Sequence, residues 1–304
     1  MDRLAPGISY VDLMFRATPR IVATAVIQGP RGVALLDPGP TSTLPTLMSE
    51  LERGGIRMGD LTDIVLTHIH LDHAGATGTL VRSNPALKVF VHEKGAPHLV
   101  DPAKLLASAG RLYGDQMETL WGEVAPVPAG ALSSLAGGER IEAGGRRFDV
   151  AYTPGHASHH VSYFNEETGL AFVGDTAGIK RTATGMVLAP TPPPDIDVES
   201  WEASLARIGA WRPDTLFITH FGPAAPYAPH LNELREHLHF TMEIVRESLT
   251  RDGTDEDRER WFTERVRLEL RRRINESDAH AYEVAGRFDL NWRGLARYLR
   301  KKAG

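Results

Sequence analysis

Apolar residues form short runs separated by turn residues up to about residue 225, and fall at helical spacing beyond it. Residues 8–14, 21–28 and 33–37 are three such runs in close succession, with Pro30-Arg31-Gly32 between the last two. Runs of this length joined by short turns predict an antiparallel β-meander. Later runs predict strands at residues 63–67, 88–92, 139–142, 148–153, 161–165, 170–174 and 215–219, with helices near 43–53 and 198–210 and a third ending near 83.

Two segments differ from this alternation. Residues 93–121 have helical character interrupted at Gly110 and Gly114, and residues 122–147 are rich in Gly, Pro and Ala, which predicts a loop that crosses to a second sheet. Beyond Pro229 the pattern predicts helices at 231–251, 255–274 and 279–302, the last interrupted near 288–291. We therefore expect an α/β catalytic domain at residues 1–228 and an α-helical region at residues 229–304 packed on it.

Composition narrows the classes of function. The 304 residues are 42% hydrophobic, carry a net charge of −5 and include no cysteine. Without cysteine, disulfides, zinc–thiolate sites, iron–sulfur clusters and cysteine nucleophiles are excluded. The charge gives no broad basic field for nucleic acid, and no apolar run reaches the roughly 18 residues that span a bilayer. We expect a cytoplasmic protein without nucleic-acid or membrane partners, and a homodimer stays open.

The chemistry is concentrated in Thr67-His68-Ile69-His70-Leu71-Asp72-His73. An apolar strand precedes this segment and a predicted helix follows it. Taken singly, Asp72 could cap that helix and each histidine could be a satisfied core residue. Taken together, closely packed imidazoles and carboxylates repel when charged, and a bound cation removes that cost. The segment therefore predicts a metal site.

Three further polar groups follow apolar strands in the second half of the chain. His156 comes after residues 148–153, Asp175 after 170–174, and His220 after 215–219. Strand ends are a usual place for binding groups. Asp37 ends the third strand, where it could either support the metal site from behind its ligands or start a turn.

In this order the residues resemble the metallo-β-lactamase superfamily. The match covers Asp37, the 68–73 segment, His156, Asp175 and His220, and Thr153-Pro154-Gly155-His156 and Gly174-Asp175-Thr176 resemble its glyoxalase II-like branch. The resemblance implies an αββα sandwich with the metals at one edge of the two sheets, here carrying a C-terminal α-helical extension.

The resemblance also implies the ligands. His68, His70 and His156 would hold one divalent ion, Asp72, His73 and His220 a second, and Asp175 would bridge them. Neutral imidazoles and carboxylates suit Zn²⁺ and leave Fe and Mn open. Two such ions share a hydroxide that attacks the substrate carbonyl, and Asp72 is also the candidate catalytic residue that orients the nucleophile or moves its proton.

The leading hypothesis is a binuclear hydrolase of a small ester, thioester or lactone. The alternatives are a mononuclear iron enzyme similar to persulfide dioxygenases and a non-catalytic metal-binding protein. A small acyl compound is the expected substrate. Phe221, Tyr227, Arg181 and Tyr113 are candidates for its pocket, although packing or surface roles are open for each, and His92, His98 and His159 are interpreted as structural.

Overall fold

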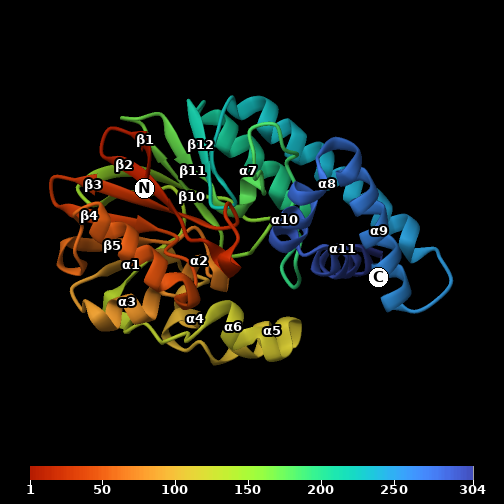
Figure 1. Cartoon of the computed structure of the whole chain (residues 1–304), viewed down its shortest axis with the longest axis horizontal. Coiled ribbons are helices and arrows are strands. Elements are labelled where there is room, and N and C mark those ends of the chain that lie inside the picture. The colour runs from red at the N-terminus through yellow and green to blue at the C-terminus, as the bar shows by residue number, and fades with distance from the viewer. Residues whose placement is uncertain (304) are drawn as a thin grey trace.

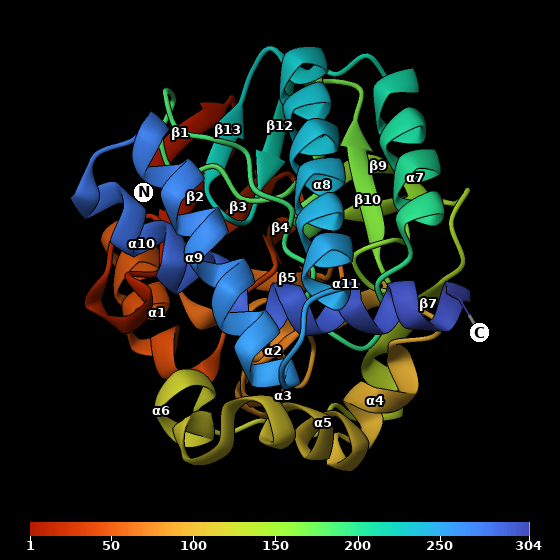
Figure 2. The same ribbon diagram turned by 90° about the vertical axis from the view of Figure 1, so that its right-hand side faces the viewer.

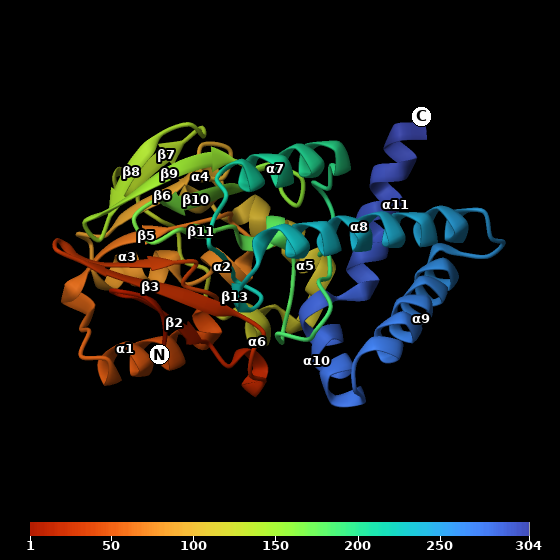
Figure 3. The same cartoon turned by 90° about the horizontal axis from the view of Figure 1, so that it is seen from above.

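The computed structural model describes residues 1–303. Two β-sheets lie face to face, helices cover their outer sides, and a group of long helices extends beyond the sandwich at the C-terminal end (Figure 1). Seen from above, the group of C-terminal helices extends away from the strands of the sandwich (Figure 3). The expected αββα sandwich with a helical C-terminal extension is confirmed.

The first sheet contains seven strands in sequence order. Strands β1 to β4 pair antiparallel, as the meander prediction required, and β4 to β7 pair parallel. The strands are β1 (Asp2–Ala5), β2 (Ile8–Asp12), β3 (Ala23–Gly29), β4 (Gly32–Leu36), β5 (Leu61–Val65), β6 (Lys88–His92) and β7 (Leu132–Leu135).

The second sheet has the order β13-β12-β11-β10-β9-β8. The pair β11–β12 is parallel and the other neighbours are antiparallel. As a result β9, β11 and β12 run in the same direction. The strands are β8 (Arg140–Ala143), β9 (Arg146–Tyr152), β10 (Val161–Asn165), β11 (Leu170–Phe172), β12 (Thr215–Ile218) and β13 (Gly222–Ala224).

Both faces of the central strands are buried, which explains why their sequences are almost continuously apolar. On β4, Ala34 and Leu36 pack against the second sheet, whereas Val33 and Leu35 pack against the outer helices, where Leu47 belongs to the same core. This alternation follows from the two-residue period of a strand. The inter-sheet core therefore fixes where the strands of the two sheets end relative to one another.

The helices of the sandwich are α1 (Leu44–Arg53), α2 (Leu71–Ala74), α3 (Thr77–Ser83), α4 (Ala96–Val100), α5 (Ala103–Tyr113), α6 (Met117–Trp121) and α7 (Val198–Ala210). The C-terminal helices are α8 (Tyr227–Leu249), α9 (Asp255–Arg273), α10 (Glu276–Gly286) and α11 (Phe288–Ala303). Figure 2 shows α5 and α6 running below these C-terminal helices. Short 3₁₀ turns lie at Phe15–Ala17, Thr41–Thr43, Met58–Asp60, Gly114–Gln116, Ala129–Ala131 and Gly174–Ala177.

The structure corrects three local predictions. Gly110 lies inside α5 and does not interrupt it, whereas Gly114, with a φ of +55°, ends that helix. The predicted loop at 122–147 contains β7, whose register comes from parallel pairing with β6. The last helical segment is interrupted at Arg287 alone, which has a φ of +41°, so that residues 288–291 belong to α11.

Buried hydrogen bonds, as well as apolar contacts, join the C-terminal helices to the sandwich and to one another. Tyr282 on α10 donates a hydrogen bond to the carbonyl of Met186 at 2.8 Å, and the indole of Trp292 on α11 donates to Ser248 on α8 at 2.8 Å. The division into domains at residue 228 stays a prediction; α8 begins at Tyr227. Within residues 1–303, the helices all lack the combined length and apolar character needed to cross a membrane.

Candidate metal centre

Four strand ends deliver the predicted metal ligands to one edge of the sandwich, and a fifth delivers Asp37. The 68–73 segment follows β5, His156 follows β9, Asp175 sits in the 3₁₀ turn after β11, and His220 follows β12. Asp37 follows β4, which is parallel to β5. Because these strands share a direction and their sheets face each other, residues far apart in sequence meet there. The structure brings all seven predicted ligands together, and metal binding by them stays a prediction.

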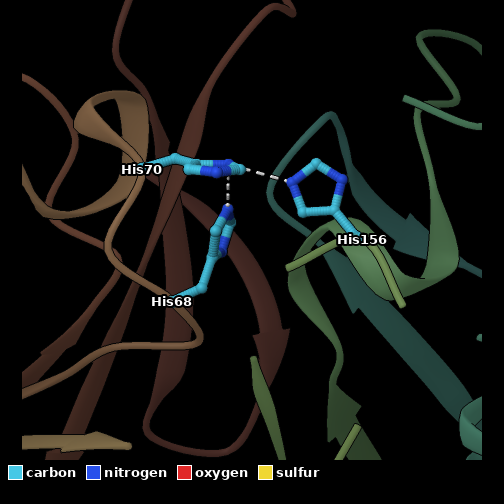
Figure 4. Close-up of side chains that lie close together, drawn as sticks. All are labelled: His68, His70 and His156. Carbon is cyan, nitrogen blue, oxygen red and sulfur yellow. Dashed lines mark hydrogen bonds between the residues drawn. The ribbon is translucent and has the colours of Figure 1, made fainter. Parts of the chain in front are cut away.

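Three imidazole nitrogens converge in the first cluster (Figure 4). His70 Nδ1 lies 2.9 Å from His68 Nε2 and 3.0 Å from His156 Nε2. The remaining ring nitrogens of His68 and His156 lie beside the Thr67 hydroxyl at 3.1 Å and the Pro190 carbonyl at 2.9 Å. Since those outer nitrogens carry the hydrogens, the two Nε2 atoms present lone pairs toward the cluster, as metal ligands do.

The second cluster contains Asp72, His73 and His220. Asp72 Oδ2 lies 3.4 Å from His220 Nε2 and 3.9 Å from His73 Nε2. The His220 Nδ1 atom donates to the carbonyl of Ile21 at 2.6 Å, which leaves Nε2 as the ring nitrogen that faces Asp72. This second set of nitrogen and oxygen ligands therefore also faces inward.

Asp175 lies between the two clusters. Its Oδ2 is 3.4 Å from His156 Nε2, and its Oδ1 is 3.2 Å from His73 Nε2 and 3.4 Å from His220 Nε2. The turn that carries Asp175 packs tightly, because a Cβ on the preceding Gly174 would lie 2.6 Å from Thr67 Oγ1. Asp175 thus directs Oδ2 toward His156 and Oδ1 toward His73 and His220.

Buried ligand atoms without hydrogen-bond partners in the described part of the chain show that these side chains fit bound cations. His73 Nε2 and Asp175 Oδ1 are buried and lack a hydrogen-bond partner in residues 1–303, although they lie 3.2 Å apart. With the hydrogen of neutral His73 on Nδ1, two lone pairs face each other across that gap. A divalent cation satisfies both atoms, because imidazole and carboxylate are among its common ligands.

Asp37 supports the site from behind the predicted ligands and lies in a bend after β4. It is fully buried with a φ of +50°. Its Oδ1 accepts the backbone N–H of Thr67 at 2.8 Å, and its Oδ2 accepts from the Thr67 hydroxyl, His73 Nδ1 and the Thr219 hydroxyl at 2.7, 2.8 and 2.9 Å. One carboxylate thereby fixes the orientation of His73 and ties two strand ends together.

Protonation states also suit cation binding. Burial lowers the pKa of His70 to about 3, and the rings of His156 and His159 act in the same direction. Burial would raise the pKa of Asp72, but the charges of His73 and His220 hold it at about 2. The first cluster is therefore neutral imidazole, and Asp72 is an ionised carboxylate.

His73, unlike His70, lies in surroundings that raise its pKa. Burial lowers its pKa, but the carboxylates Asp175, Asp37 and Asp72 together raise it well above the usual value. The surroundings of His73 therefore favour a positive charge at this position, which either a proton or a bound cation supplies.

A cavity of about 330 Å³ adjoins the clusters and is lined by His70, Asp72, His156, Asp175 and His220. Of the four pocket residues proposed from the sequence, Tyr113 lines it. Arg181 instead donates to the carbonyls of Pro19 and Arg20, Phe221 packs against Tyr10, and Tyr227 packs against the core of the helical layer. These three side chains therefore make structural contacts outside the cavity, hydrogen bonds for Arg181 and packing for Phe221 and Tyr227.

Two histidines interpreted as structural also line the cavity. His159 lies beside the first cluster, with its ring centroid 5.7 Å from that of His70, and His98 comes from α4. His92 keeps a packing role, stacked on Tyr152 with ring centroids 4.5 Å apart. The sequence offered one signal for His159, its position three residues after His156.

Other cavity residues carried no distinguishing signal in the sequence. They include aromatic, basic and C-terminal side chains: Phe15, Lys94, Lys104, Trp121, Arg287, Leu290 and Asn291. They meet only through the packing of the Phe15 turn, α5, α6 and the C-terminal helices. Tertiary structure therefore makes this part of the site.

Comparisons with known proteins agree with this geometry. Residues 17–220 match the family model described as the metallo-beta-lactamase superfamily. The chain is 29% identical to the metallo-beta-lactamase fold-containing protein ST1585 of Sulfurisphaera tokodaii over 74% of this chain and 84% of that protein. It is 30% identical to the hydroxyacylglutathione hydrolase of Maricaulis maris over 59% of this chain and 56% of the hydrolase, little more than half the hydrolase's length.

Two solved structures add to the comparison. The metallo-beta-lactamase family protein TTHA1429 of Thermus thermophilus matches with a TM-score of 0.71 and 25% identity, covering 99% of this chain and 95% of that one. TTHA1623, described in a di-iron-bound form, matches with a TM-score of 0.51 and 26% identity, covering 67% and 89%.

Proposed function

Because the chain belongs to the metallo-beta-lactamase superfamily, we propose that it is a hydrolase of a small ester, thioester or lactone that uses two divalent metal ions. The observation that carries the proposal is the placement of Asp175. One of its oxygens faces His156 and the other faces His73 and His220, at 3.2 to 3.4 Å. A carboxylate shared between two inward-facing clusters suits two neighbouring cations.

The predicted ligands would be assigned to the two ions as follows. His68, His70 and His156 would hold one ion, Asp72, His73 and His220 the other, and Asp175 both. Bound in pairs, divalent ions supply an activated water nucleophile and polarise the substrate carbonyl. Zn²⁺ is the proposed metal on ligand type, and iron remains a candidate because the similar TTHA1623 is described with two irons.

Asp72 is the proposed catalytic carboxylate. Its side chain is 25% exposed and lines the cavity, whereas that of Asp175 is 5% exposed. An ionised carboxylate at this boundary can accept a hydrogen bond from the attacking water and pass the proton to the leaving group. Tyr113 stays protonated because burial raises its pKa above the usual range, so its hydroxyl is available as a donor to substrate.

The test combines metal analysis with a hydrolysis screen over thioesters, lactones and aryl esters. We expect two ions per chain, and loss of both metal and hydrolysis in His68→Ala. His239→Ala is the matched control, since His239 is about half exposed and pairs with Glu202 on the helical layer. A hydrolysis rate unchanged in His68→Ala contradicts the proposal.

The same experiment separates the alternatives. One iron per chain together with oxygen consumption on a persulfide, and without ester hydrolysis, would establish the mononuclear dioxygenase. Metal binding with neither activity would favour the non-catalytic protein. The convergence of Asp72, His73 and His220 as a second complete set favours two ions.

A further inference from the structure

We propose that the cavity beside the metal centre accepts a bulky apolar acyl group, an aromatic one or a medium-length alkanoyl chain. This assignment rests on the proposed hydrolase function and adds the class of substrate. A cavity of about 330 Å³ is at the small end of ligand sites and holds about ten groups of the size of a water molecule. A two-carbon acyl group would leave most of it unfilled.

The first observation is an apolar stripe on α5 that the protein itself does not cover. Leu105, Ser108, Ala109 and Leu112 line the cavity from this helix. Their spacing of three and four residues places them on one helical face. Both leucines remain partly exposed, although Leu105 adjoins the apolar core below. An exposed apolar face inside a cavity indicates a ligand with apolar surface.

The second observation is the aromatic wall beside that stripe. Trp121 stacks on Phe15 with ring centroids 5.6 Å apart, and Tyr113 packs edge-on against Trp121 at 5.0 Å. All three rings line the cavity, and Phe15 and Trp121 are almost fully buried. Such a wall is rigid and offers flat apolar contact to an alkyl chain or a ring.

The C-terminal helices complete this wall without adding a free charge. Val284, Ala285 and Leu290, at the junction of α10 and α11, line the cavity. The guanidinium of Arg287 lies 5.2 Å from the centre of the Tyr113 ring and pairs with Asp289 at 2.8 and 3.0 Å. Because Asp289 balances its charge, Arg287 covers the aromatic wall and leaves no unpaired cation there.

Polar residues gather on a different part of the lining. Lys94 donates to the Tyr152 hydroxyl at 2.8 Å, that hydroxyl donates to the Ser158 carbonyl, and the Ser158 hydroxyl donates to Asp195 at 2.5 Å. Lys94 is exposed, so this side meets solvent. The alcohol or thiol leaves first and needs a path to water, and we therefore assign the acyl group to the enclosed aromatic side.

The experiment measures hydrolysis and binding separately. Thioesters of one small polar thiol, from acetyl to decanoyl and including phenylpropanoyl, give kcat/KM on the zinc-loaded enzyme. Burial of each methylene favours binding enough to raise kcat/KM about fourfold, so octanoyl exceeds acetyl by at least a hundredfold until the cavity is filled. In parallel, Kd of the matching carboxylates is measured by quenching of tryptophan fluorescence.

Ser108→Phe fills the cavity from a partly exposed helical position and should abolish the gain beyond about four carbons in both measurements. Ala107→Phe is the matched control, because Ala107 is exposed on the neighbouring face of α5 and does not line the cavity. Folding of both variants is checked by urea unfolding.

The outcomes distinguish the two proposals. Length-dependent carboxylate binding without hydrolysis of any thioester would leave the apolar pocket standing and refute the hydrolase. Hydrolysis that is as fast for acetyl as for octanoyl, or a length dependence that survives in Ser108→Phe, would refute the apolar acyl pocket while the hydrolase stands. A preference that follows alkyl length on the alcohol side of isomeric esters would overturn the acyl assignment.

Discussion

Replacement of Asp37 by Asn tests whether the buried carboxylate sets the hydrogen position on His73. The two side chains have the same shape, and Asn also tolerates the φ of +50° found here. The change leaves one acceptor oxygen where two received four hydrogen bonds, those from Thr67 N–H, the Thr67 hydroxyl, His73 Nδ1 and the Thr219 hydroxyl.

Either orientation of the new amide is unfavourable. With its nitrogen toward His73, the ring must move its hydrogen to Nε2, and that atom is then unable to bind a cation. With its nitrogen toward Thr67, two N–H donors oppose each other in a buried site, which costs about 1–3 kcal/mol. A hydrogen bond to a charged group, worth about 1.5–3 kcal/mol, is lost as well.

We therefore expect Asp37→Asn to weaken binding of one of two zinc ions by 10- to 100-fold, the range typical of groups that orient metal ligands. Competition with a chelator measures the affinity, and urea unfolding of the metal-free protein measures the stability. Thr219→Val is the matched control, since it removes a neutral partner of Asp37 and keeps the His73 contact. Zinc affinity in Asp37→Asn equal to that of the wild type would refute the reasoning.

Three further predictions follow. Chelation of the bound metal should lower the urea midpoint, since an ion at 100 times its Kd stabilises the native state by about 2.7 kcal/mol; equal midpoints with and without chelator would show that no folded-state site is occupied. Burial, followed by the charge of Arg273, lowers the pKa of His237 to about 3, and its Nδ1 accepts the N–H of Ala189 at 3.1 Å. Because the folded pKa lies below the unfolded value of about 6.5, this stabilisation is complete above pH 6.5 and is lost as the pH falls toward 3. From pH 7 to pH 5 the metal-free wild type should lose about 2 kcal/mol more stability than His237→Asn, and equal losses in urea unfolding would contradict the burial argument. Asn291 Oδ1 accepts the N–H of Thr191 at 2.8 Å, next to the Pro190 carbonyl that orients His156, so Asn291→Ala should weaken zinc binding by less than Asp37→Asn does; a wild-type affinity by chelator competition would exclude this link.

The C-terminal helices matter to the site because they contact the loop beside His156. Gly294 on α11 approaches that loop so closely that a Cβ there would overlap the Thr191 carbonyl oxygen. The Thr191 hydroxyl donates to the backbone carbonyl of Asn291 at 3.2 Å. The helical region therefore forms part of the cavity wall and also fixes the loop that orients one predicted ligand.

The sequence alone predicted ten of the thirteen strands in residues 1–303, the order of the two halves and the seven candidate ligands. Strand identity follows from local hydrophobic runs, and His156, Asp175 and His220 each follow such a run directly. Strand ends are a usual place for binding groups, and the resemblance to the metallo-β-lactamase superfamily predicted that these residues meet. The 68–73 segment needed no tertiary information, since its groups are neighbours in the chain.

Only the tertiary structure decided the β7 strand, the role of Asp37 and the walls of the cavity. Leu132–Leu135 becomes a strand through its pairing with β6, and Trp121, Leu290 and Asn291 reach the cavity through the packing of separate helices. The converse also occurs. Phe221 directly follows His220 in the sequence and Arg181 comes shortly after Asp175, yet both side chains make their contacts outside the cavity. The physical reason is that a ligand position depends on one strand end, whereas a wall depends on how several independently formed elements bury their apolar faces against one another.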